Sequence, residues 1–262
     1  MREGRSLAAL MCVVAVVASA QVSRAEGPAL EVDTDLALQT TYVFRGVPQY
    51  ITDETTSLQL GGQGGVEGDS GRWDFSLRVA SSLQERKANA QIGSADEFVP
   101  QISATWYAHP TVSWSFGVVD YIRPHSDDLN FRAEAFTRVD WLALDHERVK
   151  MFPFVAVYGE FLSLLGAFVG LGVVTQVDLG EGFSLDSVVQ GGASQYLREG
   201  ERFNFASLEV ALSFTAPSLE RLLVSGFVST SVTESAIQVS TDFLERHNVT
   251  WSGLRIGYRA LP

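Results

Sequence analysis

LNFRAEAFTRVDW, residues 129 to 141, alternates apolar and polar side chains over thirteen residues. Strict alternation predicts a β-strand, because successive side chains of a strand point to opposite faces of the sheet. Strands of soluble domains usually have about five or six residues, whereas a strand that crosses a bilayer needs roughly 9–11. The stretch therefore predicts a transmembrane strand, with its charges inside a barrel and its odd-numbered residues facing lipid: Leu129, Phe131, Ala133, Ala135, Thr137, Val139 and Trp141.

The same alternation recurs along the chain, and short connections such as Asp69-Ser70-Gly71 alternate with longer ones. Short turns at one end and long loops at the other are typical of outer-membrane barrels. We therefore expect an all-β fold, an antiparallel transmembrane β-barrel of about twelve strands. The expected strands cover about 30–45, 56–67, 72–80, 98–108, 111–121, 129–141, 149–159, 165–177, 183–196, 204–215, 221–232 and 248–260.

Large aromatic residues supply a separate indication. If the short turns are periplasmic, these residues fall at the periplasmic ends of their strands and on the outward parity, where an interfacial aromatic girdle is expected. A soluble core would not collect them at one end of every strand. Trp251 departs from the pattern, because it falls on the inward parity of the last strand. The expected membrane girdle consists of Trp73, Trp106, Trp114, Trp141, Phe183, Phe214 and Tyr258.

The first residues have the layout of a secretory signal peptide. Arg2 and Arg5 precede the apolar stretch LAALMCVVAVVASA, which is too short for a membrane-spanning helix. Small residues allow cleavage after Ala20 or Ala25. The only cysteine, Cys12, lies inside this segment. We expect residues 1–25 to be removed and residues 26–262 to form the barrel in the outer membrane of a Gram-negative bacterium, in contact with lipid.

The charge of the chain argues against nucleic-acid binding. Removal of residues 1–25 takes away three arginines and one glutamate, so the net charge changes from −12 to −14. Lys87 and Lys150 are the only lysines. So acidic a surface repels a phosphate backbone.

Charges of both signs fall on the inward parity of the expected strands. Arg255, Arg259 and Asp186 belong to this set, and the mixture of signs leaves the ion selectivity open. Arg45 is expected at the extracellular mouth, where Gly46 allows the turn into the first loop. The expected pore-lining residues are Arg45, Asp74, Arg78, Arg132, Glu134, Arg138, Asp140 and Glu209.

These features predict a small porin-like channel for the passive diffusion of small polar solutes. About eight strands leave an interior filled by side chains, and 16–18 leave an aqueous channel; twelve lie between these limits. A non-conducting barrel with a structural or surface-interaction role is the alternative, with the loops near 84–97 and 233–247 as its working parts. An outer-membrane enzyme ranks third. The oligomeric state stays open.

Residues suited to catalysis or metal binding are sparse. His125-Ser126 and His247-Asn248 contain residue types of a Ser–His–Asn arrangement, but no motif links either histidine to a particular serine. Acidic loop residues beside His125 are explained as solvated surface. We expect no catalytic residue, no metal site and no cofactor.

The stretch TTYVFRGVPQ, residues 40–49, resembles the end of the first strand in the TorF-like family of proteobacterial outer-membrane porins. Tyr42, Phe44, Arg45, Gly46 and Gln49 match the family's pattern Tyr-x-Phe-Arg-Gly-x-Ser-Gln. Pro48 replaces its serine, and the chain ends in Ala-Leu-Pro rather than in the aromatic residue of many bacterial barrels. The resemblance covers about ten residues and implies an outer-membrane barrel and a channel.

Overall fold

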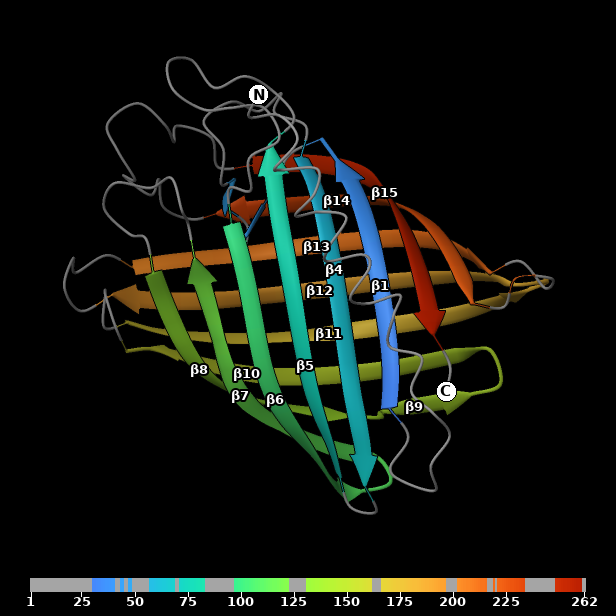
Figure 1. Ribbon diagram of the computed structural model, residues 1–262, viewed down its shortest axis with the longest axis horizontal. Helices are drawn as coiled ribbons and strands as arrows, with labels where there is room; N and C mark the ends of the chain where they lie inside the picture. Colours follow the sequence, from blue (N-terminus) through green and yellow to red (C-terminus); the bar gives the residue numbers. More distant parts are fainter. Residues whose placement is uncertain are drawn as a thin grey trace, which may run out of the picture.

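The computed structural model of the chain consists of long antiparallel strands and three short ones (Figure 1). It describes residues 30–40, 43–44, 47–48, 57–68, 71–82, 97–122, 131–161, 166–196, 202–215, 219, 221–233 and 248–260. The strands are β1 (Leu30–Gln39), β2 (Val43–Phe44), β3 (Val47–Pro48), β4 (Ser57–Gly68), β5 (Gly71–Ser82), β6 (Glu97–His109), β7 (Val112–Ile122), β8 (Phe131–Trp141), β9 (Leu144–His146), β10 (Val149–Glu160), β11 (Gly166–Gly180), β12 (Phe183–Tyr196), β13 (Arg202–Thr215), β14 (Leu222–Thr233) and β15 (Asn248–Ala260).

Twelve of these strands close into a barrel. Each long strand pairs with the next long strand along the chain, and β1 pairs with β15, so no long strand has a free edge. Figure 1 shows this closure, with β1 in blue beside β15 in red. Closure satisfies the backbone hydrogen bonds along both sides of every long strand, which a sheet needs in order to span lipid. The all-β, twelve-stranded antiparallel barrel expected from the sequence is confirmed.

The outer face of the barrel is apolar and exposed. Leu171 and Leu254 are 63% and 61% exposed, and Leu36, Phe116 and Val228 also lie on the surface. Such a belt would be unfavourable in water but is the surface that a lipid bilayer requires. No helix in the part of the chain that the structure describes is long and apolar enough to cross a membrane.

The observed strands follow the expected ones closely in the second half of the chain. The main difference concerns the end of the first strand. The expectation that it continues through Phe44 is wrong: β1 ends at Gln39, opposite the first residue of β4, Ser57. Beyond that point β4 offers no partner, and Phe44 pairs with Val47 in the two-stranded sheet of β2 and β3. Arg45 lies outside the described residues.

Ala133 is a second correction. The register places it on the outward parity of β8, but its side chain is only 2% exposed, so it does not form part of an open lipid-facing surface. The chain continues past β10 at this position, and the Phe161 N–H donates a hydrogen bond to the Ala133 carbonyl.

The tight connection between β11 and β12 shows why glycine occurs in it. Gly180, Glu181 and Gly182 have φ of 84°, 54° and 83°, a left-handed conformation that costs glycine little. A Cβ on Gly182 would lie 2.2 Å from the Thr215 carbonyl oxygen. This turn fixes the register of the β11–β12 hairpin at the end of the barrel where the sequence predicts short connections.

We expect the ends with short turns to face the periplasm, since outer-membrane barrels carry their longer loops outside. An accessible tag at Asn89 should therefore be labelled on intact cells, whereas a tag at Asp145, in β9, should be labelled only after permeabilisation. Labelling of the Asp145 tag alone on intact cells would reverse this orientation.

Candidate functional site

The inner wall of the barrel is identified by contacts that skip a strand, because only side chains on the concave face can meet across an intervening strand. Arg255 of β15 lies 3.9 Å from Glu209 of β13, beyond β14. The ring of Phe168 in β11 stacks on that of Phe205 in β13, beyond β12, with centroids 5.8 Å apart. Since paired residues share a face, the register extends this inner face to the twelve strands of the barrel.

Seven of the eight expected pore-lining residues share this inner parity; Arg45 lies outside the described residues. Their side chains lie inside the closed sheet, and their role in a pore remains a prediction. Six of them take part in ion pairs along or between strands. The seven are Asp74, Arg78, Arg132, Glu134, Arg138, Asp140 and Glu209.

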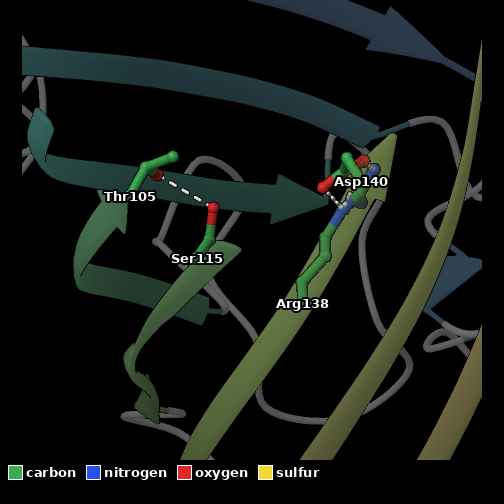
Figure 2. A network of polar contacts seen from close by, with 4 residues as sticks. All are labelled: Thr105, Ser115, Arg138 and Asp140. Carbon is green, nitrogen blue, oxygen red and sulfur yellow. Dashed lines mark hydrogen bonds and ion pairs between the residues drawn. The ribbon is translucent and has the colours of Figure 1, made fainter. Parts of the chain in front are cut away.

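Arg138 and Asp140 form the best-defined of these pairs (Figure 2). The Arg138 Nε donates to both Asp140 carboxylate oxygens at 3.0 and 2.8 Å, and its Nη2 donates to Oδ1 at 2.5 Å. The guanidinium also lies 3.9 Å from the centroid of the Phe154 ring. Two-residue spacing puts both charges on one face of β8, and the ring of Phe154 on the neighbouring strand β10 lies beside the guanidinium.

Hydroxyl groups line the wall beside this pair. Figure 2 shows Thr105 of β6 and Ser115 of β7, whose oxygens are 2.8 Å apart and hydrogen-bonded. The register continues from Ser115 directly to Arg138. Hydroxyls and a charge pair therefore make this sector of the inner wall polar.

A second pair is buried deeper. The Arg132 Nη2 donates to Glu134 Oε1 at 2.7 Å, and the Glu134 side chain is only 1% exposed. The Tyr121 hydroxyl lies 3.4 Å from the other carboxylate oxygen. Glu160 of β10 lies directly opposite Glu134 and is 5% exposed. Two carboxylates thus face each other across adjacent strands, with the Arg132 guanidinium beside one of them.

Glu209 is held from two further strands. The Ser229 hydroxyl donates to Glu209 Oε2 at 2.7 Å, and Arg255 approaches Oε1. The Arg255 guanidinium lies 5.1 Å from the centroid of the Phe227 ring. Charge pairs beside aromatic rings therefore occur in two separate sectors of the inner wall.

Sequence reasoning missed several inner residues. Arg72 forms an ion pair with Asp74 on the same face of β5, and Glu97 and Glu160 are buried on the inner face. A usable signal was present, because Arg-x-Asp or Arg-x-Glu recurs on the inward parity at residues 72–74, 132–134 and 138–140. Two-residue spacing of opposite charges in a strand places them side by side.

The expected girdle residues lie near the ends of their strands, at the short-turn end. The rings of Trp106 and Trp114 are 6.4 Å apart, and those of Phe183 and Phe214 are 4.6 Å apart. The Trp114 indole N–H donates to the Thr137 hydroxyl at 2.5 Å, so its polar group is satisfied on the outer face. Trp73, at 62%, is the most exposed tryptophan of the described strands. Contact of these rings with a membrane interface remains a prediction.

Trp251 pairs with Ser229 on the inner face, as the sequence pattern indicates.

Within the ranges that the structure describes, no group of three or more His, Cys, Asp or Glu residues could hold a metal ion. His125 and His247 lie outside those ranges.

Comparisons with known proteins identify the fold. No family model matches the chain, and no curated protein is similar to it. An outer-membrane channel from Pseudomonas putida F1 matches with a TM-score of 0.57 and 10% identity, over 92% of this chain and 98% of that one. A bacterial polysaccharide outer-membrane secretin matches with a TM-score of 0.52 and 8% identity, over 90% of this chain and 100% of that one. The chain thus has the fold of an outer-membrane β-barrel, and its apolar belt suits that membrane. The resemblance to the TorF-like family stays a prediction.

Proposed function

We propose that this barrel is a porin-like channel of the bacterial outer membrane through which small polar solutes diffuse passively. The observation that supports it is the contrast between the two faces of one closed sheet: apolar side chains cover the outside, whereas the inside carries charges, hydroxyls and amides together with several aromatic rings. Such a wall offers a polar path across hydrocarbon. We propose no catalytic role and no cofactor for it.

The chemistry of the inner wall favours cations among those solutes. Four arginine–carboxylate pairs contribute no net charge. They are Arg72 with Asp74, Arg132 with Glu134, Arg138 with Asp140, and Arg255 with Glu209. In the described strands, the register places two further arginines on this face, Arg78 and Arg259, whereas the further carboxylates are more numerous, five of them within the wall. Carboxylate-lined pores attract cations. The five are Asp33, Asp35, Glu97, Glu160 and Asp186.

Conductance in a planar bilayer tests the proposal. The purified protein should give discrete conductance steps, and a salt gradient should give a reversal potential of the sign expected for cation preference. A folded protein that inserts without conducting would support the alternative of a closed structural barrel. Part of the interior is filled by side chains, which is what a closed barrel would require. The inner residues that show this are each 1% exposed: Glu134, Ser229 and Ser231.

Replacing Arg138 with Gln should increase the cation preference of the channel. The change removes a fixed positive charge from the inner wall and leaves the Asp140 carboxylate without its guanidinium partner. The stability loss should be small, about 1 kcal/mol or less, because both side chains are partly exposed. Reversal potentials in a salt gradient measure the shift. The control is R138Q/D140N, which removes both charges and should return the preference towards that of the wild type.

A further inference from the structure

A continuous row of aromatic rings lines part of the inner wall. Phe136 of β8 stacks on Tyr158 of β10, with centroids 5.5 Å apart. Tyr158 contacts Phe168 of β11 at 5.7 Å, and Phe168 stacks on Phe205 of β13 at 5.8 Å with the ring planes 13° apart. Strand β12 lies under this row and contributes no ring to it.

Glycine explains how the row crosses β12. Gly192 of β12 pairs with Gly170 on one side and with Phe205 on the other. A Cβ on Gly192 would lie 2.4 Å from Phe168 Cζ and 2.5 Å from its Cε2, closer than real Cβ contacts, and 2.9 Å from the Val169 carbonyl oxygen. A Cβ on Gly170 would lie 3.0 Å from Phe168 Cε1. The Phe168 ring therefore lies over two backbone segments, and with Phe205 and Tyr158 packed against it only 7% of the residue is exposed.

The same arrangement occurs at two other inner phenylalanines. A Cβ on Gly172 would lie 2.7 Å from Phe154 Cζ, and a Cβ on Gly253 would lie 2.7 Å from Phe227 Cζ. Strand side chains normally stand roughly perpendicular to the sheet, which in a barrel directs them toward the axis. A glycine on the adjacent strand instead gives the ring room to lie along the wall.

We propose that Gly192 determines the width of the lumen by holding the Phe168 ring against the wall, and that it thereby sets the largest solute that passes. This inference rests on the proposed channel function. A side chain at position 192 must displace the Phe168 ring. Because the backbone lies beneath the ring, the ring can move only toward the lumen.

Single-channel conductance and solute size limits test the inference. Gly192→Ala should lower the conductance by about twofold or more, since conduction follows the radius of the pore. In a liposome-swelling assay with neutral sugars of increasing size, it should exclude sugars that the wild type admits. Phe168→Ala should raise the size limit. The double variant G192A/F168A should regain at least the wild-type limit, because no ring is then displaced into the lumen.

Gly62→Ala is the matched control. Gly62 is a strand glycine on the outward parity of β4, and a Cβ there meets nothing within 4 Å. This variant should conduct like the wild type. A merely structural role of Gly192 would lower stability without changing the size limit.

The possible failures are distinguishable. A folded wild type that does not conduct overturns the channel function and this inference with it. A conducting wild type whose size limit is unchanged in both G192A and F168A overturns the inference alone. If G192A does not fold, F168A decides: a raised limit supports the inference, and an unchanged limit overturns it.

Discussion

A barrel with arginine in place of Ala135 should be less stable than the wild type by about 2–4 kcal/mol, the cost of a charge near the middle of a bilayer. Ala135 is exposed on the outward parity of β8, between Val118 and Gly159 on the adjacent strands. It lies six residues from Trp141 along the strand. At about 3.3 Å per residue and a tilt of roughly 45°, that is about 14 Å above the girdle.

Steric clash would not explain such a loss. A Cβ on Gly159 would meet nothing within 4 Å, so the outer surface beside Ala135 is open. The free energy of unfolding in lipid vesicles, from denaturant titration, measures the effect. The matched control is Gln101→Arg, which adds the same charge on the inner face of β6 between Ser76 and Val119. That variant should lose little stability. Equal losses at both positions would contradict the assignment of a lipid face and a lumen face.

Removing Arg132 should cost the barrel about 3–5 kcal/mol, because breaking one side of a buried ion pair leaves a charge without its partner. The Glu134 carboxylate, 1% exposed, would lose the guanidinium that approaches to 2.7 Å. Glu160 lies directly opposite it, and like charges in facing positions repel. Arg132→Ala should therefore lower the free energy of unfolding strongly.

The double variant R132A/E134Q separates this cause from lost packing. An amide at position 134 carries no charge, so most of the lost stability should return. If the double variant is as unstable as R132A, the loss comes from the packing of the arginine side chain rather than from the broken ion pair with Glu134. Denaturant titration of all three proteins gives the comparison.

Much of the barrel follows from the sequence because a strand has a period of two. Alternation along a single strand assigns each side chain to one of two faces without reference to any other strand. The charges of residues 129–141 were therefore placed on the inner face, and the aromatic residues near the short turns on the outer one. Turn residues marked most strand ends, so twelve strands could be counted. The place where β1 ends was not predictable in this way, because it depends on where β4 begins.

Alternation says which face a residue occupies but not which residue lies beside it around the barrel. That depends on the register of neighbouring strands, which the closed sheet alone determines. Arg138 and Asp140 were predictable partners, since both lie on one strand. Glu134 opposite Glu160, Arg255 beside Glu209 across β14, and Phe168 over Gly192 all join residues far apart in the chain. The period of two was therefore enough to identify the two faces and the membrane-spanning strands. The partners inside the lumen depend on the folded barrel, because they meet only once the strands are in register and the sheet is closed.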